Sequence, residues 1–388
     1  MIKNDEISII YYFRMYAHSL INKLLRCLLI KKDLYPKPEN LHLSSYEKIS
    51  KEIIDAETLL SRKNNLNIPL NMWQITARKK LIKIAGHKPV KRVKNAILPN
   101  KKFETDEYTR EKIYLRAEKG LDIPVTVLKS RQTDNTQRGL IFLAGSLSGV
   151  HVGWGERKVP ADNLVIGAGS TIPLEAVKRN ITTFCIEMPG YGERQEKHLI
   201  PTSLDPKVDS FCLSLLTGRS LLGRQTSDVS TVFNWIRNNS DEFNIDPKNI
   251  VLFGHSVGGT IATYTGALDE NIPAIVASGS IGFIKDTIGR RRNSNGSSII
   301  PNILNWFEMD DVISLIAPRP FYALAGDKDH IWPIDGALKV VKSANDQLKN
   351  CIWETDIIKC SGKHRYYPKE SWVCLEKAYD ALYKIKTN

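Results

Sequence analysis

The chain has 388 residues, of which 42% are hydrophobic and 25% are charged. This composition excludes a disordered or fibrous protein. The chain has enough apolar residues for one large hydrophobic core and a smaller accessory region. The net charge of +13 is uneven, because residues 1–100 hold 19 Lys and Arg against 8 Asp and Glu. A basic accessory region therefore precedes a nearly neutral remainder of the chain.

Residues 1–100 carry a helical pattern. Apolar residues recur at helical spacing over residues 46–60 and 73–84, and Gly86 and Pro89 close the second run. We interpret residues 1–100 as a basic helical cap. Its charge is expected either to attract an anionic substrate, an acidic polymer or a membrane, or to form a solvated face without a partner. Nucleic acid is not expected, because no binding motif and no interleaving of basic and aromatic residues is present.

Residues 7–30 are the one stretch that resembles a membrane or targeting element, but Arg14, His18, Lys23 and Arg26 interrupt it. A spanning helix needs about 20 mostly apolar residues, and a signal peptide needs an unbroken apolar region before its cleavage site. We predict a basic amphipathic helix that packs on its own protein or lies on an anionic membrane surface. The six cysteines show no metal-binding spacing, which favours reduced thiols and a cytoplasmic location.

From residue 111 onward, short apolar runs alternate with helical segments. This alternation predicts a mostly parallel sheet with helices on both faces, in a domain over residues 101–388. Two longer stretches, 195–222 and 282–305, fit no strand and are predicted to act as lids. The predicted strands are 112–116, 123–128, 139–143, 182–188, 249–253, 274–278, 320–325 and 351–358, and the predicted helices are 172–179, 225–239, 259–268 and 369–384.

The strongest local signal is the motif Gly-His-Ser-Val-Gly at residues 254–258, which follows a strand-like run and precedes a helical run. A serine between a strand and a helix occupies a strained tight turn. Glycines flank it because larger side chains would collide with the neighbouring strand and helix. This arrangement is the nucleophile elbow, and Ser256 is the candidate nucleophile. The adjacent His255 is predicted to pack or to line the pocket, because neighbouring side chains on such a turn point apart.

A serine hydroxyl needs a base that takes its proton, and the base needs a carboxylate that fixes its tautomer. In folds built around this elbow, the acid and the histidine follow the serine in that order. Only His330 and His364 follow Ser256 in the sequence. His364 is the predicted base because it comes after the last predicted strand. His330 lies in the same turn as the candidate acids and is expected to line the pocket or to be structural.

The acid should lie in the loop that follows the predicted strand 320–325. Asp329 is the predicted acid because it occupies the later position of that turn. Asp327 is the alternative, although its side chain is suited to cap the turn through its own backbone. Asp310 and Asp311 are more remote candidates, which we interpret as an N-cap and an exposed charge of the helix that follows them.

A tetrahedral intermediate needs two backbone N–H donors for its oxyanion. The first is predicted to come from Val257, directly after the nucleophile, and the second from Ser146, in the loop after strand 139–143. No metal or cofactor is predicted, because the eight histidines do not cluster and no glycine-rich phosphate-binding motif follows a strand.

Further segments carry a resemblance to a known family. They are residues 73–89, Glu-Met-Pro-Gly-Tyr-Gly-Glu at 187–193, Ser-Leu-Leu-Gly at 220–223, Asp228, Val229, Trp235, Asp-Pro at 246–247, Phe-Glu-Met-Asp at 307–310 and Ala-Pro-Arg-Pro at 317–320. In this combination and order, the chain resembles the α/β-hydrolases related to acetyl xylan esterases and dienelactone hydrolases. The resemblance covers about residues 70–388.

The resemblance implies hydrolysis of an ester, often of an acyl group on a sugar, with Ser256, Asp329 and His364 as the triad. One departure concerns the oxyanion loop, where Ala144 and Gly145 stand in place of the family's His-Gly, so that a loop-stiffening contact is missing. We therefore predict an α/β-hydrolase fold with an N-terminal helical cap and a covalent acyl-enzyme. The alternatives are cleavage of a C–C bond or an amide by the same triad, and a non-catalytic protein that uses the fold for binding.

Overall fold

The computed structural model describes residues 41–387, apart from 94, 95, 98–101, 119, 133–136, 201, 202, 204, 291–295, 349 and 350, together with Ile21 and Leu24. The chain divides into two compact units between Glu52 and Ile53, and helix α2 (Ser45–Asp55) contains this division. Apart from Ile21 and Leu24, the predicted helix at 7–30 lies outside the described residues. No helix in the described part of the chain is long and apolar enough to cross a membrane, and the cytoplasmic location stays a prediction.

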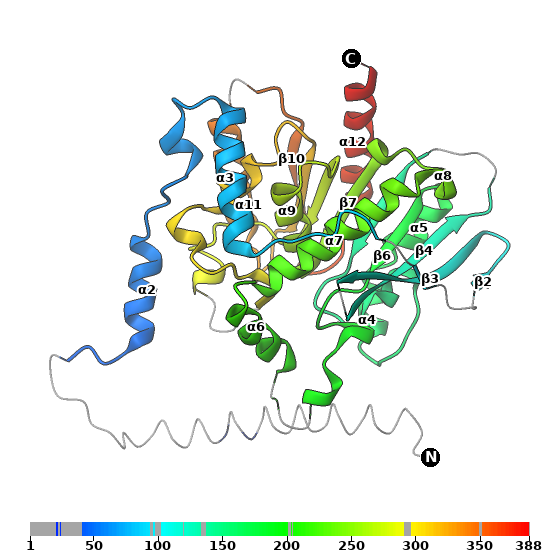
Figure 1. Cartoon of the computed structure of the whole chain (residues 1–388), viewed down its shortest axis with the longest axis horizontal. Coiled ribbons are helices and arrows are strands. Elements are labelled where there is room, and N and C mark those ends of the chain that lie inside the picture. Colours follow the sequence, from blue (N-terminus) through cyan, green and yellow to red (C-terminus); the bar gives the residue numbers. More distant parts are fainter. Residues whose placement is uncertain are drawn as a thin grey trace. The chain divides into compact units, whose positions relative to one another are not determined.

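The second unit is built on one sheet, which has ten strands among the described residues (Figure 1). The strand order is β1-β3-β4-β6-β5-β7-β8-β9-β10, with β2 paired to β3. The six neighbouring strands β6, β5, β7, β8, β9 and β10 pair in parallel. The pairs of β3 with β1, β2 and β4, and of β4 with β6, are antiparallel. The strands are β1 (Ala96–Ile97), β2 (Lys102–Glu104), β3 (Tyr108–Glu118), β4 (Leu121–Ser130), β5 (Gly139–Leu143), β6 (Thr182–Ile186), β7 (Ile250–His255), β8 (Ala274–Ser278), β9 (Phe321–Gly326) and β10 (Thr355–Cys360).

The central strands β5 to β9 are buried at every position because both of their faces are covered. In β7, Ile250 and Leu252 belong to the core on one face of the sheet, and Val251 and Phe253 belong to the core on the other. Successive strand residues point to opposite faces, so burial of both faces produces a continuous apolar run. The predicted fold class, a mostly parallel sheet with helices on both faces, is confirmed.

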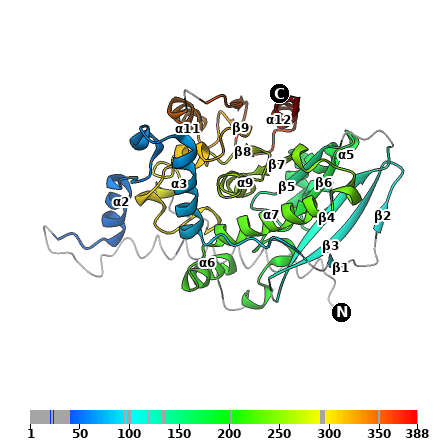
Figure 2. The same cartoon turned by 45° about the horizontal axis from the view of Figure 1, so that its top comes forward.

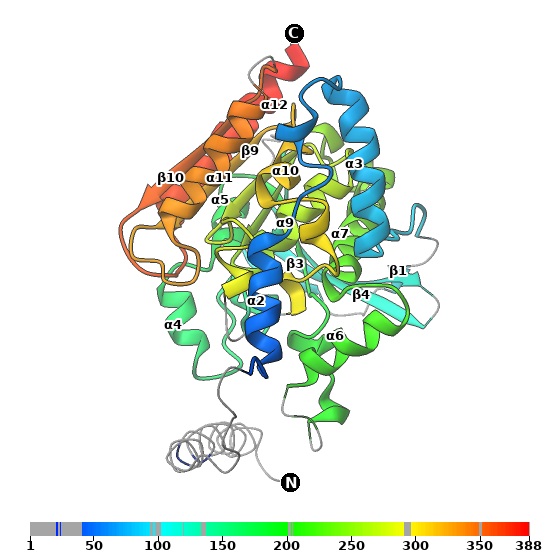
Figure 3. The same ribbon diagram turned by 90° about the vertical axis from the view of Figure 1, so that its left-hand side faces the viewer.

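Two groups of helices cover the sheet, and Figure 2 shows α7 and α9 on one face with α12 on the other. Figure 3 shows α11 beside β10 at one edge of the sheet. The first face packs against α3 (Leu70–Ala85), α7 (Leu221–Asn238), α9 (Val257–Leu268), α10 (Met309–Ser314) and α11 (Ile334–Gln347), and the second against α5 (Ile172–Lys178) and α12 (Pro368–Thr387). The remaining α-helices of this unit in the described part of the chain are α4 (Asp162–Gly167), α6 (Pro206–Leu216) and α8 (Ser240–Phe243).

Helix α3 belongs to the sheet-containing unit, although the sequence placed it in a cap over residues 1–100. Trp73, Ala77, Leu81 and Ala85 are buried within the core of the first face. Gly86, with a φ of 68°, ends the helix and its N–H donates to the Ile82 carbonyl. The division between the units therefore lies some fifty residues before the predicted boundary at residue 100. Helical spacing reveals an apolar face but not the element that covers it.

The stretch 195–222, which fits no strand and was predicted to act as a lid, contains helix α6. Asp205 is its N-cap and accepts a hydrogen bond from the backbone N–H of Lys207, while Pro206 occupies the first helical position. The signal for this helix was local, because Asp followed by Pro is a common helix start. The other stretch, 282–305, contains the short 3-10 helices η6 (Ile288–Arg290), η7 (Gly296–Ser298) and η8 (Ile303–Asn305).

Candidate active site

Ser256 lies in the sharp turn between β7 and α9. Its backbone has a φ of 54° and a ψ of −119°, a strained conformation for a residue with a side chain. Close packing around the turn requires glycine on both sides. A Cβ atom on Gly254 would lie 2.1 Å from the Gly258 carbonyl oxygen, and one on Gly258 would lie 2.3 Å from the Leu143 carbonyl oxygen. The structure thus contains the nucleophile elbow expected from the sequence.

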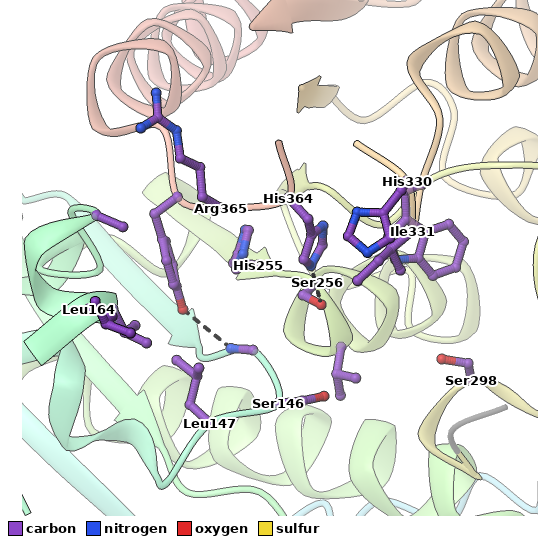
Figure 4. Close-up of a pocket in the computed structure, with 16 residues that line it drawn as sticks. Ser146, Leu147, Leu164, His255, Ser256, Ser298, His330, Ile331, His364 and Arg365 are labelled. Atoms are coloured by element: carbon purple, nitrogen blue, oxygen red, sulfur yellow. Dashed lines mark hydrogen bonds between the residues drawn. The ribbon is translucent and has the colours of Figure 1, made fainter. Parts of the chain in front are cut away.

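The three residues predicted as a triad lie in hydrogen-bonding contact. Ser256 Oγ is 2.9 Å from His364 Nε2, and His364 Nδ1 is 2.7 Å from an oxygen of Asp329. A carboxylate only accepts hydrogen bonds, so Nδ1 carries the proton and Nε2 is left to accept from the serine hydroxyl. Figure 4 shows Ser256 and His364 joined by this bond at the centre of the site. The arrangement suits transfer of the serine proton to His364.

Asp329 is held in place by the backbone of its own loop. The oxygen that does not face His364 accepts hydrogen bonds from the N–H groups of Ile331 at 2.8 Å and Trp332 at 2.9 Å. Burial alone would raise the pKa of Asp329, but the hydrogen bonds from His364 and these N–H groups outweigh it and keep the pKa below its ordinary value. The carboxylate is therefore charged at neutral pH and fixed in orientation.

Asp327, the alternative acid, contacts a different group. Its carboxylate accepts a hydrogen bond from the Gly362 N–H at 2.8 Å, in the loop that leads to His364. The structure thus brings Asp329, and not Asp327, to the imidazole. His330 is exposed and lines the pocket. Lining the pocket is one of the two roles that the sequence predicted for this histidine.

His255 is a buried neighbour of the nucleophile. Its Nδ1 is 2.9 Å from Ser278 Oγ, and its ring stacks at 5.2 Å from the ring of His364. Burial, assisted by the nearby His364, lowers the pKa of His255 to about 3. The ring is therefore neutral at physiological pH and lines the pocket, in agreement with the packing or lining role expected for it.

The two residues predicted as oxyanion donors, Val257 and Ser146, both lie in the pocket at Ser256. Val257 is the first residue of α9, where backbone N–H groups have no partner within the helix. Ser146 follows β5, and both residues line the same pocket as Ser256. The hydroxyl groups of Ser146 and Tyr191 lie 3.4 Å apart. These positions suit two N–H donors around a carbonyl oxygen at Ser256.

The loop after β5 is fixed further along by Glu187, which directly follows β6. Both carboxylate oxygens of Glu187 accept from the backbone N–H of Val150, at 3.1 and 3.3 Å. Burial raises the pKa of Glu187 to about 7. Glu187 belongs to the segment 187–193, which the sequence singled out only by resemblance. Its role was missed because the partner, a backbone N–H 37 residues away, leaves no trace in the sequence.

A pocket of about 750 Å³ opens above Ser256. Leu147 and Leu164 lie on one side of the serine, and His330 and Ile331 lie on the other (Figure 4). The predicted lid stretch 282–305 contributes Ser298, whereas the described residues of 195–222 are not part of this lining. The pocket has the size of a small-molecule site, with lining residues on both sides of Ser256.

The interpretation of Asp310 and Asp311 as an N-cap and an exposed charge was wrong, since both are buried. Glu308 caps α10, and Asp311 completes a capping box with it. Asp311 also accepts hydrogen bonds from the Ser61 hydroxyl and the Arg62 N–H, and Asp310 accepts from Ser343 and Gln347. Tertiary partners override the local helix-start pattern here. Within the described residues, no group of three or more His, Cys, Asp or Glu is placed to hold a metal ion.

The sheet order, the elbow after β7 and the positions of Asp329 after β9 and His364 after β10 are those of the α/β-hydrolase fold. A family model described as BD-FAE matches residues 216–335, which include Ser256 and Asp329. The Bacillus subtilis (strain 168) protein named "Putative hydrolase YtaP" is 28% identical over 156 residues, or 39% of this chain. The match covers 48% of that relative, about half of its length.

Solved structures share the fold over most of the chain. A protein described as a "putative acetyl xylan esterase" from Bacteroides fragilis NCTC 9343 has a TM-score of 0.65 and 20% identity, with 84% of each chain covered. A glucuronoyl esterase from Teredinibacter turnerae T7901 has a TM-score of 0.58 and 11% identity, covering 81% of this chain and 86% of its own. A glucuronoyl esterase from Solibacter usitatus has a TM-score of 0.56 and 13% identity, covering 79% and 93%.

Proposed function

We propose that this chain is a serine esterase that hydrolyses carboxylic esters through a covalent acyl-enzyme. The observation that carries the proposal is the unbroken hydrogen-bonded series from Ser256 through His364 to Asp329, on a strained turn beside a pocket of about 750 Å³. The solved structures with this fold include proteins described as esterases, which supports the same chemistry for this chain.

In the first half of the reaction, Ser256 Oγ attacks the carbonyl carbon of the ester while His364 Nε2 takes its proton. Asp329 accepts the Nδ1–H bond and stabilises the positive charge that forms on the imidazole. The N–H groups of Val257 and Ser146 stabilise the oxyanion. His364 then gives the proton to the alcohol oxygen as the C–O bond breaks, and the acyl group stays on Ser256.

In the second half, water replaces the alcohol. His364 takes a proton from the water molecule as its oxygen attacks the acyl carbon, and then returns the proton to Ser256 as the acyl-enzyme bond breaks. The products are a carboxylic acid and the regenerated serine. Because the pocket extends to both sides of Ser256, it suits an acyl group on one side and an alcohol on the other.

The proposed substrate is an ester of a small molecule, with an acyl group on a sugar as the first class to test. Names such as acetyl xylan esterase and glucuronoyl esterase among the proteins of like fold support carbohydrate esters. The rival reactions differ in the bond, since a C–C bond next to a ketone or an amide could be cut by the same three residues. Acetylated sugars, nitrophenyl esters of short and long acids, the matching amides and diketones therefore form the substrate panel.

The purified protein should hydrolyse at least one ester of this panel, and a fluorophosphonate should label Ser256. Ser256→Ala should lose both activities and keep the melting temperature within a few degrees, because the substitution removes a single hydroxyl. Turnover of amides or diketones without ester hydrolysis would change the assigned bond. A folded protein with neither turnover nor labelling would contradict the proposal and favour a binding role.

A further inference from the structure

The loop that carries the candidate base also contacts the loop that carries a candidate oxyanion donor. Tyr366 lies two residues after His364, and its side chain is only 3% exposed. Its hydroxyl oxygen accepts a hydrogen bond from the backbone N–H of Gly145 at 3.3 Å. Gly145 directly precedes Ser146. One tyrosine thus joins two loops that are 221 residues apart in the sequence.

The ring of Tyr366 is itself held in place. It packs on the ring of His255, with 3.9 Å between the ring centroids and 32° between the ring planes. His255 is fixed by the 2.9 Å contact between its Nδ1 and the Ser278 hydroxyl. Because His255 directly precedes Ser256, the ring of Tyr366 packs against the turn that carries Ser256. Its hydroxyl therefore has a defined position relative to the nucleophile.

Gly145 lies close above the elbow. A Cβ atom at this position would come within 3.3 Å of His255 Cδ2 and 3.4 Å of Ser256 Cβ. The Gly145 carbonyl accepts a hydrogen bond from the Leu147 N–H at 2.8 Å. Because a peptide group is planar and trans, the Ser146 N–H points opposite to that carbonyl. The two bonds to Gly145, one at its N–H and one at its carbonyl, together set where the Ser146 N–H points.

We propose that Tyr366 is a positioning residue, which fixes the Ser146 oxyanion donor relative to Ser256 and His364 through its hydrogen bond with Gly145. This role rests on the proposed ester hydrolysis at Ser256. The contact also stiffens the oxyanion loop, which begins with Ala144 where related hydrolases have histidine. The link between the loop of His364 and the loop of Ser146 matters most in the transition state. There, negative charge develops on the carbonyl oxygen and the Ser146 N–H has to point at it.

Tyr366→Phe tests the role, because it removes the hydroxyl and keeps the ring on His255. Without its acceptor, the buried Gly145 N–H has to find another partner, and the loop shifts. A misplacement of about 1 Å near the reacting atoms can cost roughly 100-fold in rate. We expect kcat to fall about 10-fold to 100-fold while KM stays within about twofold, because ground-state binding does not depend on the donor.

Tyr379→Phe is the matched control. Tyr379 is also buried, and its hydroxyl donates to the Gly139 carbonyl at 2.9 Å, but it lies on α12 outside the pocket lining. Both variants lose one tyrosine hydroxyl bonded to the backbone, so their melting temperatures should fall by similar amounts. Only the Tyr366 variant should lose kcat.

A trifluoromethyl ketone analogue of the substrate reports on the oxyanion site directly, since its adduct with Ser256 places an oxyanion beside the two N–H donors. We expect its inhibition constant to rise in Tyr366→Phe by about the same factor as kcat/KM falls, and to stay unchanged in Tyr379→Phe. An active wild type with Tyr366→Phe at unchanged kcat and inhibition would overturn the positioning role. Equal losses of kcat in both variants would also overturn it.

A measurement on the wild type keeps the test valid if Tyr366→Phe does not fold. In protein labelled with ¹⁵N-glycine, the Gly145 amide should exchange slowly with solvent, and rapid exchange would contradict the bond to Tyr366. Failure of the proposed esterase function would be recognised differently, because the wild type itself would neither turn over an ester nor react with a fluorophosphonate. In that case the positioning role of Tyr366 would fail as well.

Discussion

The Asp327 carboxylate accepts a hydrogen bond of 2.8 Å from the Gly362 N–H, and so joins the loop of Asp329 to the loop of His364. The same two loops are joined a second time, because the Lys328 N–H donates to the Gly362 carbonyl at 2.9 Å. The two aspartates of this turn therefore have separate tasks. Asp327 holds the backbone of the base loop, and Asp329 holds the imidazole.

Replacing each aspartate by asparagine should separate these tasks. Asp329→Asn keeps the shape but removes the charge that fixes the imidazole tautomer, and we expect kcat to fall by roughly 10⁴-fold, as in other triads. Asp327→Asn still offers an oxygen to the Gly362 N–H, so kcat should fall less than about tenfold. Steady-state kinetics on one ester measures both, and the reverse ranking would identify Asp327 as the acid.

His364→Ala should reduce kcat about as much as Ser256→Ala, and the double variant should lose no more than either single variant. The reason is that the base and the nucleophile act as a unit, so that the second substitution removes nothing further. His330→Ala, at an exposed position on the pocket wall, should change kcat by less than about tenfold. A greater loss in His330→Ala than in His364→Ala would contradict the assignment of the base.

Glu187 should make stability depend on pH. Its pKa is raised from 4.5 to about 7 by burial, so the folded state binds this proton more tightly than the unfolded state. The stabilisation from this proton is complete below pH 4.5 and is lost as the pH rises through 7. In Glu187→Gln this loss is absent, so its free energy of unfolding relative to wild type should rise between pH 5 and 8, by about 3 kcal/mol at most.

Urea denaturation at several pH values measures this difference. Glu175→Gln is the control, because Glu175 is a partly exposed carboxylate on α5 that pairs with Lys178 and Arg179. Its stability relative to wild type should change little over the same range. A pH-independent difference between Glu187→Gln and wild type would show that Glu187 is charged throughout.

The sharp turn at Ser256 could be predicted from the sequence because its signal is local. Ser256 needs a strand before it, a helix after it and glycines beside it, and all of these are neighbours along the chain. His364 followed from chain order and from its place after the last strand. The structure brings these residues together with Asp329 in the arrangement that chain order implied.

The supporting contacts could not be predicted in the same way. Tyr366 and Gly145 are 221 residues apart, and Glu187 binds a backbone N–H in a loop 37 residues away. A backbone N–H has the same chemistry at every residue except proline, so the sequence does not indicate which one a side chain will bind. The burial of Asp311 was missed for the same reason, since one of its partners is the backbone N–H of Arg62.

The last prediction concerns the charge of residues 1–100, which carry 19 Lys and Arg against 8 Asp and Glu. If this region draws an anionic substrate to the pocket, kcat/KM for an anionic ester should fall steeply as salt is raised from 0.01 M to 0.15 M, where the Debye length shrinks to about 8 Å. A neutral ester of the same acyl group should be almost unaffected.

If the region instead binds a membrane, the protein should sediment with anionic vesicles but not with neutral ones. Deletion of residues 1–32 should abolish this sedimentation while hydrolysis of a small ester continues. Parallel salt curves for the two esters, together with no vesicle binding, would leave the positive charge as a solvated surface without a partner.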